Sequence, residues 1–163
     1  MAKLVLLLGS NLGVKKNNLQ TAIKELNTMV DKVVTQSKIY ATDAWGNTEQ
    51  EPFLNLCLII ETEKTPEEVL RRTLMIEKKM GRIRTAKQYE PRLIDIDILF
   101  YDNLISDSHQ LTIPHEHIAD RRFTLTPLAE ILPNFIHPVH QKSILELWNE
   151  CTDTLACKPL GNL

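Results

Sequence analysis

The chain has 163 residues, of which 43% are hydrophobic and 25% are charged, and its net charge is −2. This length suits a single domain over residues 1–163, and the composition argues against disorder and against binding a long polyanion through overall charge. The three cysteines are an odd number without a C-x-x-C pair. They argue against a disulfide framework and against a zinc site, and they fit a reducing cytoplasm.

The apolar pattern predicts alternating strands and helices. The run at 4–8 is too short for a signal sequence or a membrane span and is typical of a strand buried on both faces, ending at Gly9. The later predicted elements are a helix within 19–30, strands at 33–42, 53–62 and 91–100, a helix at 66–80, a short strand at 104–105, and short helices at 127–132 and 143–148.

The helix at 66–80 has the clearest boundaries. Thr65 can cap its first turn, Pro66 suits the first helical position, and Glu68 completes a capping box. Gly81 supplies the C-terminal stop. Ser143 and Glu146 repeat the capping-box pattern before the last predicted helix.

The early order β-α-β-β-α-β predicts an α+β fold of the ferredoxin-like split type. In this sandwich an antiparallel sheet carries helices on one face, and C-terminal additions follow. Such a fold serves many functions, so the function has to be argued from the site.

The segment at 91–100 carries the strongest chemical signal. Its alternation places the isoleucines at 94, 96 and 98 on one face and both Asp95 and Asp97 on the other, about 7 Å apart. Two ionised carboxylates that close repel each other, and a hard divalent cation bound by oxygen relieves the repulsion. A basic group lies just upstream, made up of Arg82, Arg84, Lys87 and Arg92. Carboxylates beside arginines suit a metal-bound polyphosphate, whereas a surface strand with ordinary ion pairs remains the alternative.

No Walker A motif or protein-kinase signature is present, so a nucleotide would be held mainly by arginines and metal. Several segments together resemble the 6-hydroxymethyl-7,8-dihydropterin pyrophosphokinase family. They are L-G-S-N at 8–11, P-F-L-N at 52–55, G-R-I-R at 81–84, P-R-L-I-D-I-D-I-L at 91–99, I-P-H at 113–115 and R-x-F-x-L-x-P-L-x-E-I at 121–131.

The resemblance implies an enzyme that transfers the β,γ-pyrophosphoryl group of ATP to the pterin hydroxymethyl oxygen and releases AMP. Asp95 and Asp97 would hold two Mg²⁺ ions, one bridging the α- and β-phosphates and the other the β- and γ-phosphates. The metals would position the phosphates and absorb developing charge. No separate general base is then needed.

The resemblance also implies two sets of binding residues. Arg82 and Arg92 would act on the phosphates during the reaction, and the loop after Gly81 would close over ATP. The ATP-binding set is Glu77, Arg82, Arg84, Arg92, Ile98, Thr112, His115 and Arg121. Glu77 has the alternative of pairing with a neighbouring lysine, and His115 that of a purely structural role.

On the pterin side, the flat bicycle would stack between Phe53 and Phe123, while the Asn55 amide would pair with its edge. Thr42, Asp43 and Trp45 would line the rim, and Asp95 would also lie near this substrate. The loop after Thr42 departs from the family by reading Asp-Ala-Trp-Gly.

We therefore expect a cytoplasmic, monomeric, Mg²⁺-dependent pyrophosphokinase that binds neither nucleic acid nor membrane. Two alternatives stay open, and each predicts a different product. A non-catalytic ferredoxin-like binding module would release no AMP, and a metal-dependent nucleotidyltransferase would release pyrophosphate instead.

Overall fold

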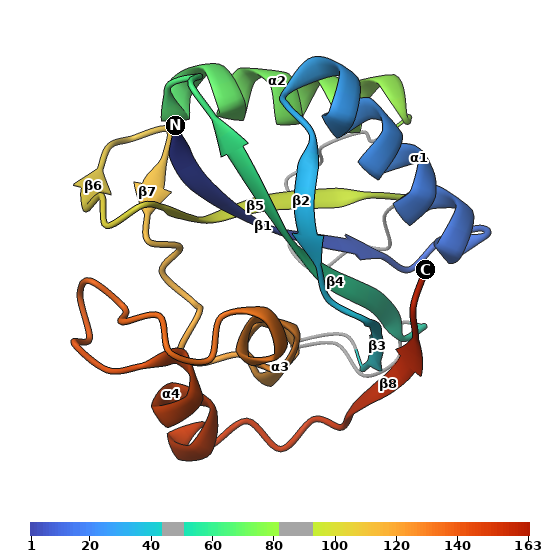
Figure 1. The fold of residues 1–163 in the computed structure, drawn as a ribbon. Coiled ribbons are helices and arrows are strands. Elements are labelled where there is room, and N and C mark those ends of the chain that lie inside the picture. The colour runs from blue at the N-terminus through green and yellow to red at the C-terminus, as the bar shows by residue number, and fades with distance from the viewer. Residues whose placement is uncertain (44–50, 82–92) are drawn as a thin grey trace.

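The computed structural model describes residues 1–43, 51–81 and 93–163. Within these ranges the centre of the molecule is a six-stranded antiparallel sheet with the path β5-β1-β4-β3-β8, in which β2 also pairs with β4 (Figure 1). Its strands are β1 (Ala2–Ser10), β2 (Val33–Gln36), β3 (Ile39–Thr42), β4 (Phe53–Thr62), β5 (Asp95–Tyr101) and β8 (Cys157–Gly161). A small separate sheet pairs β6 (Ser106–Asp107) with β7 (Thr112–Ile113).

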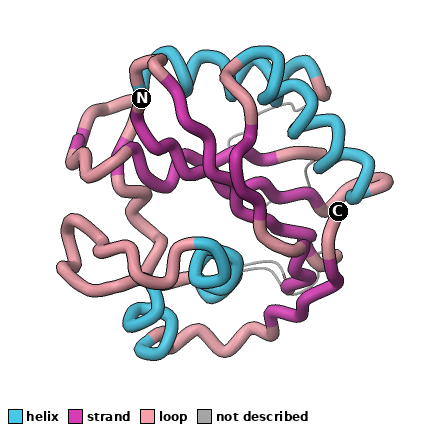
Figure 2. Tube along the Cα trace, in the orientation of Figure 1, coloured by secondary structure: helices cyan, strands magenta, loops and turns pink. Residues whose placement is uncertain are grey.

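The helices lie on both sides of the large sheet. They are α1 (Lys15–Met29), α2 (Pro66–Lys79), α3 (Arg122–Ile131) and α4 (Ile144–Glu150). Figures 1 and 2 show α1 and α2 together on one side and α3 and α4 on the other. None of these helices is both long enough and apolar enough to cross a membrane, a finding that covers the described residues.

Strand β1 runs through the middle of the core. Leu4, Leu6 and Leu8 belong to the apolar cluster under α1 and α2, whereas Val5 and Leu7 belong to the cluster under α3 and α4. This double burial confirms the prediction from the continuous apolar run. The strand does not end at Gly9, however, because pairing with β4 continues to Ser10.

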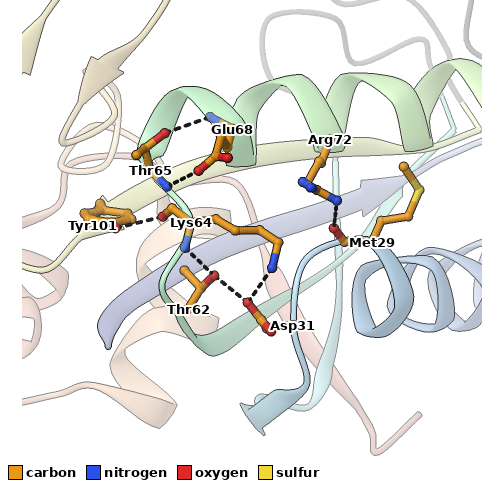
Figure 3. A network of polar contacts seen from close by, with 8 residues as sticks. All are labelled: Met29, Asp31, Thr62, Lys64, Thr65, Glu68, Arg72 and Tyr101. Atoms are coloured by element: carbon orange, nitrogen blue, oxygen red, sulfur yellow. Dashed lines mark hydrogen bonds and ion pairs between the residues drawn. The ribbon is translucent and has the colours of Figure 1, made fainter.

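Polar contacts join the start of α2 to the ends of its neighbours (Figure 3). The predicted capping box is confirmed, since Thr65 N–H donates to Glu68 Oε2 (2.8 Å) and Glu68 N–H donates to Thr65 Oγ1 (3.2 Å). Beside it, Asp31 accepts from the Thr62 hydroxyl (2.6 Å) and from Lys64 Nζ (3.0 Å). The Thr62 hydrogen bond is the main cause that lowers the pKa of Asp31. These contacts therefore fix the start of α2 relative to the end of β4 and to the residues that follow α1.

Several predicted elements have different boundaries in the structure. The single strand at 33–42 is divided into β2 and β3 at Ser37, whose hydroxyl accepts from Cys57 N–H (2.9 Å) and whose N–H donates to Cys57 O (3.0 Å). The short strand predicted at 104–105 lies instead at Ser106–Asp107, where it pairs with β7.

The helix predicted at 127–132 in fact begins at Arg122, so that Pro127 lies inside it. Its first amide is held from far away in the sequence, because Arg122 N–H donates to Asp153 Oδ2 (2.9 Å). Burial of Leu125 and Leu128 in the second core further stabilises the helix despite the proline. The helix start could not be read locally, because the capping group lies 31 residues downstream.

The predicted ferredoxin-like α+β fold is confirmed for the first elements, with α1 and α2 on one face. The C-terminal additions have two structural roles. Helices α3 and α4 cover the second face of the sheet, and β8 pairs with β3 to extend one edge of the sheet. The last helix also has its predicted capping box, formed by Ser143 and Glu146.

Candidate active site

A row of paired residues crosses the sheet on the face covered by α3. Gly9 of β1 is paired with Asp95 of β5 on one side and with Asn55 of β4 on the other, and Asn55 is paired in turn with Tyr40 of β3. Residues paired across neighbouring strands point to the same face of a sheet. The register therefore places a carboxylate and an amide on opposite sides of a glycine.

The two aspartates of β5 lie as the alternation predicts. Asp95 and Asp97 are half-buried and paired with Gly9 and Leu7, while Ile96 and Ile98 pack into the core on the opposite face. Among the described residues there is no group of three or more His, Cys, Asp or Glu that could hold a metal. The two half-buried carboxylates still offer hard oxygen ligands and leave positions for phosphate and water, which is how Mg²⁺ is commonly bound. The donor set therefore fits Mg²⁺ in the presence of a polyphosphate.

Glu77 supports the same strand from behind. Its carboxylate is only 2% exposed, and Oε2 accepts a hydrogen bond from Ile96 N–H at 2.9 Å. Ile96 is the residue between the two aspartates, and β5 is at the edge of the sheet. An edge strand has backbone amides that the sheet itself does not satisfy. Glu77 thus fixes the backbone that carries the aspartates, while its predicted contact with ATP stays a prediction.

His115 is held in one tautomer by its surroundings. The backbone N–H of His115 donates to Leu99 O (3.0 Å), and the ring Nδ1 of His115 accepts from the backbone N–H of His117 (3.2 Å). Burial, followed by the positive charge of Arg121, lowers the pKa of His115 to about 4, against smaller opposing effects of Glu116 and then Asp95. The ring is therefore neutral at pH 7, and its proton lies on Nε2, which can donate a hydrogen bond. This state agrees with the donor role predicted for His115.

Helix α3 brings Arg121 and Phe123 to the same region. The guanidinium carbon of Arg121 lies 5.7 Å from the centre of the Phe123 ring. The other end of the helix is anchored as well, because Glu130 accepts from the Tyr40 hydroxyl (2.7 Å). Burial and the neighbouring Glu130 carboxylate raise the pKa of Tyr40, so the hydroxyl remains a donor. Both ends of α3 are thus fixed over the face that carries Asp95 and Asn55.

The pterin-side residues of β3 and β4 form a connected group. Thr42 is paired with Phe53, and the Asn55 side-chain amide donates to Thr42 Oγ1 at 3.2 Å. Asn55 is 3% exposed, whereas Phe53 is half-buried. Because Phe53 and Asn55 are two residues apart on one strand, both side chains point to the α3 face. The structure therefore brings these three residues together, as the sequence predicts.

Other predicted site residues are placed less centrally. Asp43 is exposed at the end of β3, Thr112 is exposed on β7 with its hydroxyl bonded to Asp107 Oδ1 (3.2 Å), and the Ile98 side chain packs in the core under α1 and α2. Their contacts with ligands stay predictions. Four predicted residues lie outside the described part of the chain: Trp45, Arg82, Arg84 and Arg92.

The polar end of β1 contains residues outside the predicted binding sets. Ser10 and Asn11 are buried, at 0% and 1% exposure, and the Asn18 side chain donates to Ser10 Oγ (3.1 Å). Asn11 Nδ2 donates to Glu51 O (3.3 Å). Polar residues directly after a strongly apolar run were the available signal, but only the sheet register shows that Gly9 is in the row with Asp95 and Asn55.

Comparisons with known proteins show the family of this chain. Residues 5–133 match the family model of 7,8-dihydro-6-hydroxymethylpterin-pyrophosphokinase (HPPK). The chain is 41% identical over 137 residues to the 2-amino-4-hydroxy-6-hydroxymethyldihydropteridine pyrophosphokinase of Methylorubrum extorquens, covering 83% of this chain and 86% of the relative. It is 38% identical over 152 residues to the protein of the same name from Aquifex aeolicus, covering 93% and 94%.

The fold is also similar to a solved structure. The wild-type HPPK-DHPS of Plasmodium falciparum with pterin and p-hydroxybenzoate matches with a TM-score of 0.73 and 19% sequence identity. The match covers 91% of this chain but 43% of that one, so the chain spans less than half the length of that protein. At this identity the likeness supports the fold alone. The family match and the two bacterial relatives establish that this chain belongs to the 7,8-dihydro-6-hydroxymethylpterin-pyrophosphokinase family.

Proposed function

We propose that the protein transfers the β,γ-pyrophosphoryl group of ATP to the hydroxymethyl oxygen of 6-hydroxymethyl-7,8-dihydropterin, with the site on the α3 face of the sheet. As a member of its family the protein is an ATP-dependent pyrophosphokinase of folate biosynthesis. The observation that carries the proposed site is the row in which Asp95 and Asn55 flank Gly9 on one face. This row gives a phosphate-and-metal side on β5 and a pterin side on β4, the two strands that flank β1.

On the pterin side, the Asn55 amide offers a donor and an acceptor to the edge of the bicycle. Phe53 and Phe123 come from β4 and α3 and suit stacking against its two faces. Stacking and edge pairing together orient the hydroxymethyl arm, and orientation of two reactants can remove much of the barrier to their reaction.

On the phosphate side, Asp95 and Asp97 would hold Mg²⁺, and we propose two ions. When bound, Mg²⁺ neutralises phosphate charge and makes a nearby hydroxyl easier to deprotonate. His115, neutral with its proton on Nε2, donates to a phosphate oxygen, and the Arg121 guanidinium pairs with another. Arg82, Arg84 and Arg92 complete the proposed set from outside the described residues.

The reaction joins the hydroxymethyl oxygen to the β-phosphorus and breaks the bond from that phosphorus to the oxygen bridging it to the α-phosphate. AMP leaves with that oxygen, and the hydroxyl proton is released. We also propose that the protein acts as a monomer in the cytoplasm, where its three free cysteines would stay reduced. Light scattering after size exclusion tests the monomer.

Identification of the leaving group tests the reaction itself. The protein is incubated with ATP, Mg²⁺ and the pterin, and the nucleotide products are separated by chromatography. AMP is the expected product, and its amount should equal that of pyrophosphorylated pterin. Release of pyrophosphate would indicate a nucleotidyltransferase instead, and intact ATP would indicate a non-catalytic binding module.

A further inference from the structure

The backbone conformation at position 9 does not require a glycine. The described glycines with positive φ are Gly13, Gly81 and Gly161, so the backbone at Gly9 is open to any L residue. Glycine inside a strand weakens it, since it adds no side-chain contact and costs more conformational entropy. A residue with a side chain would therefore be expected at this paired position of β1, unless its space is needed for something else.

The space above Gly9 is occupied by the side chain of Asn55. A Cβ atom built on Gly9 would lie 2.6 Å from Asn55 Oδ1 and 3.4 Å from Phe53 Cδ1. The first distance is roughly 1 Å shorter than an ordinary contact of about 3.5 Å. Asn55 is 3% exposed and bonded to Thr42, so its amide cannot simply swing into solvent. A methyl group at position 9 would have to displace the amide or the ring.

We infer that Gly9 is a positioning residue of the pterin site: its missing side chain lets the Asn55 amide lie across β1 toward Asp95. The inference rests on the proposed function, because it takes Asn55 as the group that pairs with the pterin edge. It also gives the L-G-S-N segment a role in pterin binding, because Gly9 of that segment leaves the space that the Asn55 amide occupies. A displacement of about 1 Å in a positioned group lowers activity on the order of 100-fold.

The test compares Gly9→Ala with wild type by calorimetry and by turnover. Calorimetry measures the affinity for α,β-methylene ATP with Mg²⁺, and then the affinity for the pterin in the presence of that analogue. We expect pterin affinity and kcat/KM for the pterin to fall roughly 10- to 100-fold, with ATP-analogue affinity within about twofold of wild type. Ala41→Ser is the control, because it adds one atom on neighbouring β3 at a position paired with Leu54, on the other face. Unchanged pterin affinity in Gly9→Ala, or an equal loss for both ligands, would overturn the inference.

A double variant tests whether Gly9→Ala lowers pterin affinity by displacing the Asn55 side chain. Asn55→Ser removes the atom that the new Cβ would meet, so adding Gly9→Ala to it should lower pterin affinity further by less than about threefold. If Gly9→Ala lowers pterin affinity in the Asn55→Ser protein by as much as it does in the wild-type protein, the inference is overturned. Should Gly9→Ala alone not fold, recovery of folding in the double variant supports the contact, and continued unfolding refutes it. A wild-type protein that binds the pterin but releases no AMP would refute the proposed reaction, and the affinity comparison would still decide the role of Gly9.

Discussion

Replacement of Glu77 should test how the protein holds its two aspartates in place. The Glu77 carboxylate is 2% exposed and accepts Ile96 N–H at 2.9 Å, directly between Asp95 and Asp97. Glu77→Ala leaves that amide without its acceptor and creates a cavity, which together should lower the free energy of unfolding by about 3 kcal/mol. Glu77→Gln keeps an oxygen acceptor but loses the charge, and its cost should be about 1 kcal/mol.

Urea unfolding measures the stability, and AMP release at varied Mg²⁺ and ATP measures the function. We expect Glu77→Ala to lose turnover on the order of 10- to 100-fold and to need more Mg²⁺, because the aspartates lose their fixed backbone. Glu61→Ala, an exposed glutamate of β4, is the control and should change stability by less than about 0.5 kcal/mol. If Glu77→Ala unfolds like wild type and only weakens ATP binding, Glu77 contacts the nucleotide and does not position the aspartates.

Four further outcomes are expected. Asp97→Ala should lose nearly all turnover in the AMP assay yet stay folded, because it relieves carboxylate repulsion; wild-type turnover would contradict the metal assignment. Phe123→Ala should weaken pterin binding far more than ATP binding in calorimetry, whereas equal losses would indicate a packing role. Asp153→Ala removes the acceptor for Arg122 N–H and should cost about 1 kcal/mol in urea unfolding while raising KM for the pterin, because Phe123 follows Arg122 in the same turn. His115 has a folded pKa of about 4 and an ordinary value of 6.5, so below pH 6.5 the unfolded chain binds a proton that the folded protein excludes. Stability should therefore fall between about pH 6.5 and pH 4 by at most about 3 kcal/mol, and His115→Gln should flatten that slope in unfolding curves; an unchanged slope would refute the buried neutral ring.

Local patterns determined a large part of this protein. The alternation from Ile94 to Ile98 assigned both aspartates to one face, and the register with β1 agrees with it. The capping box at Thr65 and Glu68 set the start of α2. These predictions succeeded because side-chain period and capping are decided within a few residues, before any tertiary contact forms.

The start of α3 and the strand pairing of Gly9 depended on distant parts of the chain. Asp153 accepts from the first amide of α3, which lies 31 residues before it in the chain. Pro127 by itself predicts that the helix starts later than it does. The apolar run before Gly9 predicts that the strand ends there, although Gly9 pairs with both Asp95 and Asn55. Only the sheet register could place it there, because pairing joins residues that no local pattern relates.

The sequence by itself predicted the residues of the candidate site and determined which face of its strand each aspartate takes. The tertiary structure decided which of them meet: Asn55 reaches over Gly9, and His115 lies where the charges of Arg121 and Asp95 both act on it. The physical reason is one of range. Periodicity and capping act over one or two turns of chain, whereas a site is assembled by strand register and by the packing of helices against a sheet.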